Sequence, residues 1–299
     1  MNEEITTTAG AVVVEIDGSA DGLRVVDYAT MLAMRDGRDL VLVRPYRTFG
    51  TYTPGARFHP PCQRDEAGRD LREAVAHVRR QVGPRLPVGA VAREGFRIDV
   101  LSQFGRRAEV VVVPRQRVRG QQRLVAAQTD IALAARCACP VVVVPRTWKP
   151  CSGDRTVVVG VDGSALSWEA VGHAFATASR TGGDLLAVHA AGDDHPGSGD
   201  LERVVAETLA GWQEVFPDVR VIRRPTTEPV LVALARGSEH AALLVLGVHL
   251  DRNRTIGDPV TRQALAAATC PVALVRHQVT IQGDRRLRGH DGEPVVTRS

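Results

Sequence analysis

A chain of 299 residues with 44% hydrophobic content is long enough to bury about two domain cores. Charged residues make up 24% of it, and no apolar run approaches the ~20 residues of a membrane helix, so we expect no membrane span. The net charge of +4 is too weak to indicate a nucleic-acid partner. Lys149, the one lysine, precedes a proline, which excludes the lysine-dependent phosphate loops, Schiff-base enzymes and protein kinases.

The N-terminal residues 1–9 are predicted to be flexible, and they lack the basic start and apolar core of a secretory signal. A cytoplasmic location is therefore expected. The five cysteines form neither CxxC pairs nor a disulfide framework, so reduced and mostly buried thiols are predicted. These cysteines are Cys62, Cys137, Cys139, Cys151 and Cys270.

Short runs rich in Val, Leu and Ala alternate with amphipathic stretches along the whole chain. This alternation predicts parallel strands that are buried on both faces by helices. The strands expected in the first part are 11–16, 39–44, 88–93, 109–113 and 140–144. Those expected in the second part are 155–161, 184–190, 218–223, 241–246 and 271–275.

Two of the amphipathic stretches predict long helices with one core-facing stripe, over residues 65–82 and 201–216. The first stripe contains Ala67, Leu71, Ala74, Val75, Val78 and Val82. The second contains Leu201, Val204, Val205, Leu209, Trp212 and Phe216, whose aromatic members are expected to pack in the core and not to bind a cofactor.

The chain carries one unit twice, because an apolar run ends in Asp-Gly-Ser at Asp17 and again at Asp162, 145 positions later. The final strands lie only 131 positions apart, at Val141 and Val272, so the second copy is 14 residues shorter. The long connection after the second strand is the expected place of the loss.

The repeat divides the chain into a first half, residues 10–146, and a second half, residues 155–277. The Pro- and Gly-containing stretch 147–154 is predicted to link them. Residues 278–299 lose periodicity and gain charge, which predicts a disordered tail.

Each half resembles a universal stress protein domain, and the whole chain resembles the tandem form of that family. Three motifs carry the likeness in the second half: "VVVGVDGSALS", "LLAVHA" and "VTRQALAAATCPVALV". The first half has their counterparts in the same order: "VVVEIDGSADG", "LVLVRP" and "TDIALAARCACPVVVV". The resemblance implies an α/β fold of two tandem open five-stranded parallel sheets flanked by helices, Rossmann-like and of the adenine nucleotide alpha hydrolase type.

The resemblance also implies a site for ATP at the carboxyl ends of the strands, where a doubly wound sheet binds its ligands. The aspartate after the first strand would contact the adenosine, which here means Asp17 and Asp162. A small apolar residue after the second strand would pack on the adenine, namely Ala190 or, in the first half, Pro45. The phosphates would lie in a loop of pattern G-x2-G-x9-G-[ST] after the fourth strand.

Both halves depart from that loop pattern. The second keeps Gly247 but has Leu250 at the next glycine, and it ends in Gly257 and Asp258. A carboxylate beside a phosphate costs about 1 kcal/mol in water and several times more in a desolvated loop. Arg252 and Arg254 would offset part of this cost. The residues expected to bind ATP, with Mg²⁺ present only as its companion, are Asp162, Gly163, Ala190, Leu246, Gly247, Gly257, Asp258, Val260 and Thr261.

The first-half loop is predicted to be degenerate. It begins with Pro114, which has no N–H, it contains Gly120 alone, and Ala127 and Gln128 stand where Gly-Ser would be. An alternative reading of the two aspartates is that each makes an Asx turn, with Ser19 and Ser164 as helix caps.

Other polar residues indicate less. His189 lies in an apolar strand and is expected to be a core histidine with a local hydrogen bond, and no His/Cys/Asp cluster has metal spacing. The arginine-rich loop is expected to be solvated, or alternatively to attract an anionic partner. It contains Arg115, Arg117, Arg119 and Arg123.

The functional prediction is a non-enzymatic stress-response protein with at most one nucleotide site, in the second half, and an unidentified protein partner. The alternatives are a slow ATP hydrolase and a pseudo-dimer that has lost ligand binding. The halves are expected to pair through strands 140–144 and 271–275, since paired edges hide main-chain groups that invite aggregation. Further association into a homodimer is left open.

Overall fold

The computed structural model describes residues 9–47, 61–116, 122–150, 155–161, 167–190, 198–226, 228–248 and 259–276. The predicted tail, nearly all of the N-terminal segment and half of the predicted linker lie outside these residues.

All ten predicted strands are confirmed, with ends that shift by at most three residues. The first half contains β1 (Val12–Glu15), β2 (Leu40–Tyr46), β3 (Val88–Glu94), β4 (Val110–Pro114) and β5 (Val141–Val144). The second contains β6 (Val157–Gly160), β7 (Leu185–Ala190), β8 (Val221–Thr226), β9 (Leu243–Val248) and β10 (Val272–Arg276). Within each half, neighbouring strands are parallel.

Helices cover both faces of the strands. One face is covered by α1 (Leu23–Asp36), α2 (Pro61–Val82), α5 (Trp168–Thr181) and α6 (Ser198–Leu209). The opposite face is covered by α3 (Arg97–Phe104), α4 (Gln122–Arg136), α8 (Val230–Ser238) and α9 (Pro259–Ala267). Helices α1 and α5 end alike, because Gly37 and Gly182 adopt the left-handed conformation, with φ +60° and +61°.

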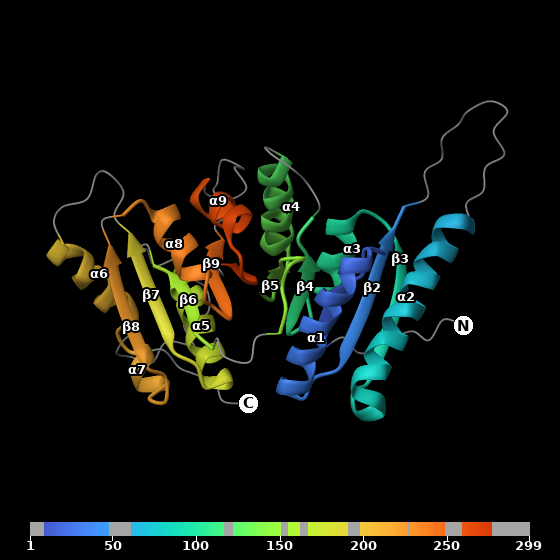
Figure 1. Ribbon diagram of the computed structural model, residues 1–299, viewed down its shortest axis with the longest axis horizontal. Coiled ribbons are helices and arrows are strands. Elements are labelled where there is room, and N and C mark those ends of the chain that lie inside the picture. The colour runs from blue at the N-terminus through green and yellow to red at the C-terminus, as the bar shows by residue number, and fades with distance from the viewer. Residues whose placement is uncertain are drawn as a thin grey trace, which may run out of the picture.

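The two five-stranded sheets join into one ten-stranded sheet of order β3-β2-β1-β4-β5-β10-β9-β6-β7-β8 (Figure 1). The junction is antiparallel, with Val142 opposite Ala273 and Val143 opposite Val272. The predicted pairing of strands 140–144 and 271–275 is confirmed. Each of the two hydrophobic cores, one on each face, contains side chains from both halves.

The helix predicted over 201–216 is wrong in one respect, because the chain breaks it in two. Helix α6 ends at Leu209, and the short helix α7 (Trp212–Val215) follows Gly211, whose φ is +82°. The predicted core role of the aromatic residues is confirmed. Trp212 packs against Phe175 and Phe216, with ring centroids 6.3 and 6.1 Å away.

The register locates the length difference between the halves. Matching residues are 145 positions apart at Leu40 and Leu185 but 133 apart at Val88 and Val221. Twelve of the 14 missing residues therefore fall between the second and third strands, as expected.

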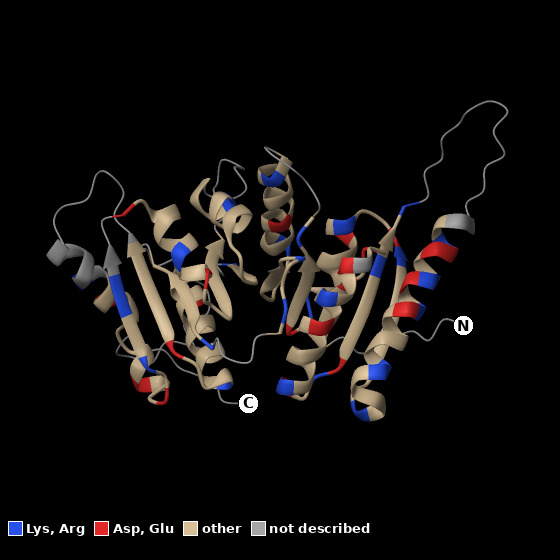
Figure 2. Ribbon diagram, in the orientation of Figure 1, with Lys and Arg blue, Asp and Glu red and all other residues tan. Residues whose placement is uncertain are grey.

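Charged residues are dense along α2 (Figure 2), where they are exposed or half-buried. The opposite side of α2 buries Leu71, Ala74 and Val78 against the sheet. Among the described residues, no helix is long and apolar enough to cross a membrane.

Candidate functional site

The strand order creates one crevice in each half. In the first half, β1 lies between β2 and β4, so the chain runs outward from β1 through β2 to β3 and then returns to β4 on the other side. In the second half, β6 lies in the same way between β7 and β9. From the carboxyl ends of the central strand and of its returning neighbour, the chain leaves toward opposite faces of the sheet. Open α/β sheets bind their ligands at such a point.

Asp17 follows β1 at the crevice of the first half. Its Oδ1 accepts hydrogen bonds from the Ser19 amide at 3.0 Å and from the Ser19 hydroxyl at 2.7 Å. The Asx turn of the alternative reading is therefore present, and Ser19 lies at the N-cap position of the turn that follows, but its hydroxyl binds Asp17 and makes no capping hydrogen bond. Gly18 makes this turn with φ +73°, and a Cβ there would lie 2.5 Å from Asp70 Oδ2.

Arg146, just beyond β5, occupies the other oxygen of the Asp17 carboxylate. The two form an ion pair in which Arg146 Nη2 donates to Asp17 Oδ2. Arg146 also donates to the Ser19 hydroxyl at 2.5 Å and, through Nε, to the Arg115 carbonyl at 2.8 Å. Burial alone would raise the pKa of Asp17, but the hydrogen bonds from Ser19 and Arg146 hold it below its usual value. This carboxylate already has its partners within the chain.

A second set of charges fills the first-half crevice on the α3 and α4 side. Arg97 Nε donates to both oxygens of Glu15, at 2.7 and 2.9 Å, and Arg97 Nη1 donates to Asp130 Oδ1 at 2.9 Å. Glu15 ends β1, Arg97 begins α3 and Asp130 lies on α4. Glu15 and Asp130 are only 6% and 1% exposed, so the triad is a buried ion cluster.

Burial dominates the electrostatics of this triad. It raises the pKa of Asp130 to about 6, although Arg97 opposes the shift. The two carboxylates hold Arg97 protonated against its own burial and raise its pKa. Asp130 therefore holds its proton near pH 6 more readily than an exposed aspartic acid would.

The second half has none of these charges at matching positions. The strand register pairs Val12 with Val110 and Val157 with Leu243, which places Gly160 at the position of Glu15 and Val230 at that of Arg97. Thr261 stands at the position of Asp130, since Cys139 and Cys270 precede the last strand of each half. A Cβ on Gly160 would meet only Leu234 and Leu246, at 3.4 and 3.6 Å. At these three positions the second half therefore carries uncharged residues.

Comparison with known proteins agrees with the duplicated architecture. The sequence pattern of the universal stress protein family matches residues 9–145 and again residues 154–276. The chain belongs to the universal stress protein family.

Relatives and solved structures extend this assignment. A universal stress protein of Mycolicibacterium smegmatis is 29% identical over 91% of this chain and 98% of its own length. One of Mycobacterium tuberculosis strain H37Rv is 32% identical over 72% of this chain and 78% of its own length. The crystal structure of a universal stress protein from Archaeoglobus fulgidus, 15% identical, covers 90% of this chain and 97% of that one with a TM-score of 0.68, which shows the shared fold.

Five of the nine site residues predicted for this universal stress protein lie in its described part. Ala190 ends β7, Leu246 and Gly247 lie in the second part of β9, and Val260 and Thr261 are in the first turn of α9. Because β7 and β9 flank β6, Ala190 and Gly247 lie at the same edge of the sheet as the carboxyl end of β6. Leu246 turns its side chain into the core and is 5% exposed. Asp162, Gly163, Gly257 and Asp258 lie outside the described residues.

The first-half ion cluster was not predicted from the sequence. A signal was present, because Glu15 is the one charged residue in the strand "VVVE", and a carboxylate buried between helices and a sheet must be paired. The partners Arg97 and Asp130 are 82 and 115 positions away and carry no motif. The ion pair of Arg146 with Asp17 was likewise not predicted, because nothing in the sequence assigned Arg146 a role.

The predicted core histidine and three of the five predicted buried cysteines are confirmed. His189 is 3% exposed, and its Nδ1 lies 2.5 Å from the Val161 carbonyl, as a core histidine would. Cys137, Cys139 and Cys270 are free and buried, and burial raises the pKa of each thiol. Cys62 and Cys151 have no described side chains. The described residues contain no group of three or more His, Cys, Asp or Glu residues that could hold a metal ion.

Proposed function

We propose that this universal stress protein binds one adenine nucleotide, ATP with its Mg²⁺, in the crevice of the second half. The protein acts without catalysis, in the cytoplasm, by changing or maintaining its contact with a partner protein during stress. The first half serves as a nucleotide-free counterpart of the same fold.

The contrast between Glu15 and Gly160 carries this proposal. In the first half, a buried carboxylate and its partners occupy the space at the end of the central strand, and Arg146 holds Asp17. A nucleotide phosphate entering there would meet Glu15 and Asp130, and it would have to break existing ion pairs. In the second half Gly160, Val230 and Thr261 stand at the matching positions, so an anionic ligand meets no buried carboxylate from these three residues.

The binding residues follow from the family resemblance. Asp162 would contact the adenosine, with Gly163 allowing the turn, and Ala190 would pack on the adenine. Leu246 and Gly247 would lead into the phosphate loop, which Gly257 and Asp258 complete. Val260 and Thr261 would stand beside the phosphates in the first turn of α9, where the dipole of the helix favours an anion.

A thermal titration with ATP and Mg²⁺ tests the proposal, since a ligand that binds only the native state raises its melting temperature by mass action. The full chain is expected to show a saturable rise. Asp162→Ala should abolish the rise, whereas Asp17→Ala, the matched variant of the first half, should keep it relative to its own baseline. Equal losses in both variants, or no rise in the unaltered protein, would contradict the proposal.

The non-catalytic part needs a separate measurement. The single lysine, Lys149, follows β5 at the junction of the halves and lies in neither predicted phosphate loop, so neither loop has the lysine with which many phosphate-transferring enzymes hold their nucleotide. Phosphate release from ATP should therefore equal that of a buffer control over hours at saturating protein. Release that disappears in Asp162→Ala would assign a slow hydrolase instead.

A further inference from the structure

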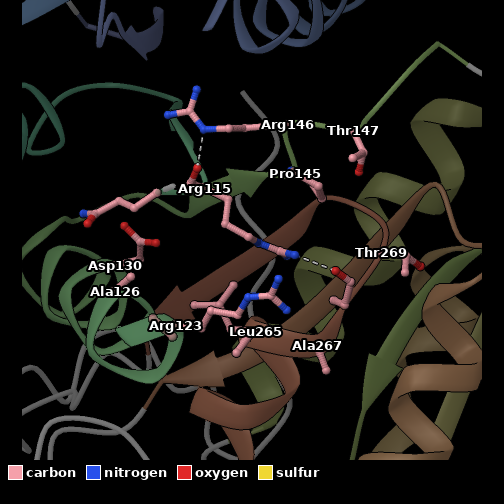
Figure 3. A pocket seen from close by; sticks show the side chains of 14 residues that line it. Arg115, Arg123, Ala126, Asp130, Pro145, Arg146, Thr147, Leu265, Ala267 and Thr269 are labelled. Carbon is pink, nitrogen blue, oxygen red and sulfur yellow. Dashed lines mark hydrogen bonds between the residues drawn. The ribbon is translucent and has the colours of Figure 1, made fainter. Parts of the chain in front are cut away.

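A cavity of about 310 Å³ lies between the two halves, next to the first-half crevice, with which it shares Asp130 and Arg146 (Figure 3). Its walls come from the residues that follow β4 and β5, from α4, and from residues 265–269 at the end of α9. No residue of β1 lines it, and neither does Asp17. The cavity therefore exists only because the halves are joined, and it has the volume of a small-ligand pocket.

Arg115 reaches across this cavity from the first half to the second. Its Nη1 donates to the carbonyl of Ala268, at the end of α9, over 2.6 Å. Its Nε and Nη2 are buried and have no hydrogen-bond partner among the described residues. Burial lowers the pKa of Arg115, which reports the cost of holding this charge out of water. Two N–H donors of this guanidinium are thus left unsatisfied by the described residues, which costs free energy unless a ligand pairs with them.

Arg123 adds a second positive charge. It is exposed in the first turn of α4, and it repels the charge of Arg115. In Figure 3 the guanidinium groups of both residues point into the space between α4 and α9, whereas that of Arg146 points away. Arg146 is already engaged by Asp17 and Ser19. Two like charges therefore share one cavity.

The single carboxyl group in the described lining, Asp130, attracts Arg115 but already pairs with another arginine. Asp130 is bonded to Arg97, which also holds Glu15. Burial raises the pKa of Asp130 to about 6, so near that pH its negative charge is partly lost. The cavity therefore carries an excess of positive charge together with unused N–H donors.

We propose that this cavity binds a small oxyanion, the phosphate or sulfate group of a compact ligand, between Arg115 and Arg123. The planar guanidinium of Arg115 offers the anion two adjacent donors, the geometry that suits such groups. The site differs from a nucleotide phosphate loop because side chains bind the anion, and because α9 of the second half closes it. Occupancy neutralises the repulsion between the arginines and ties the two halves together.

Inorganic sulfate is the probe, because its charge is constant across the working pH range. Calorimetric titration of the full chain at constant ionic strength should show saturable binding of one sulfate. Arg123→Gln should weaken the affinity by about tenfold, the usual loss for one charge-assisted hydrogen bond. Arg106→Gln, which removes an exposed arginine elsewhere, should leave the affinity unchanged. The proposal is overturned if sulfate does not bind saturably, or if the two variants bind it alike.

Substitutions in α9 test whether the second half contributes to the anion site. Ala267 lines the cavity and is exposed, so Ala267→Glu places a carboxylate beside both arginines and should abolish sulfate binding. Gln263→Glu puts the same charge on an exposed position of the same helix outside the cavity and should leave binding intact. Equal effects of these two variants would show that the anion does not lie between the halves.

The site is independent of the proposed nucleotide site, and the two are separable. Asp162→Ala should retain sulfate affinity, and Arg123→Gln should retain the response to ATP. Loss of sulfate binding in Asp162→Ala would place the anion in the second-half crevice and refute the cavity. A missing ATP response with sulfate binding intact would refute only the proposed function.

Discussion

At the scale of single residues, the buried triad of Glu15, Arg97 and Asp130 is expected to govern how the stability of the first half responds to mutation and to pH. The charges are stable together because each has a partner, but removing one leaves the others buried without full compensation.

The first prediction concerns the triad as a unit. Glu15→Met should lower the free energy of unfolding by about 3 kcal/mol or more, because Arg97 then keeps only Asp130 as a partner. The triple variant Glu15→Met, Arg97→Met, Asp130→Leu should lose less than the single variant, because it removes the buried charges altogether. Urea unfolding of the three proteins measures this, and a triple variant less stable than Glu15→Met would contradict it.

The raised pKa of Asp130 predicts a pH dependence of stability. The folded state holds this proton up to about pH 6, whereas the unfolded chain releases it near the ordinary value of 3.8. The stabilising contribution of the group is thus complete below pH 4 and is lost as the pH rises through 6. Asp130→Asn cannot ionise, so its stability relative to the unaltered protein should rise by up to about 3 kcal/mol between pH 4 and pH 7.5.

Urea unfolding at several pH values checks this prediction. Asp99→Asn, which alters a carboxylate on an exposed side chain paired with Arg136, controls for the loss of one charge. A parallel pH profile for Asp130→Asn and the unaltered protein would show that the proton is not held by Asp130.

At the scale of elements, the helix break at Gly211 predicts opposite effects for two glycine substitutions. Gly211→Ala should lower stability by about 1 kcal/mol, since its φ is +82° although a Cβ there would meet nothing within 4 Å. Gly68→Ala lies within α2 and should raise stability by about 0.5–1 kcal/mol, because alanine is the better helix former. Calorimetry measures the melting temperatures of both variants. If the two temperatures shift in the same direction, the positive φ of Gly211 does not explain the break between α6 and α7.

Some helices and strands could be predicted from the sequence alone, and others depended on tertiary contacts. Strands such as "VVVV" at 141–144 are predictable because a short run of β-branched residues between turns has few alternatives. The break at Gly211 was missed because the apolar spacing from Leu209 to Trp212 suits a continuous helix, and the need for Trp212 to pack over Gly172 is tertiary. The cavity and the triad were missed for the same reason, since Arg115 meets Ala268 across 153 positions.

At the scale of the whole molecule, the shared sheet predicts unfolding in one step. Both hydrophobic cores cross the junction, and Val142 pairs with Ala273 at its centre. Arg180 of α5 also forms an ion pair across the halves, with its Nη1 3.9 Å from Glu109 Oε1. Scanning calorimetry should give a calorimetric enthalpy equal to the van't Hoff enthalpy. Two resolved transitions would show that the halves are separate folding units despite the continuous sheet.

The antiparallel junction of β5 and β10 reproduces within one chain the contact by which two identical domains could pair. In a dimer of identical subunits, any mutation alters both sites at once, so a carboxylate that blocks one crevice blocks the other as well. Fusion into a single gene removes that coupling. Glu15 and Gly160 occupy equivalent positions yet can change separately, so a substitution in one half leaves the crevice of the other half unaltered.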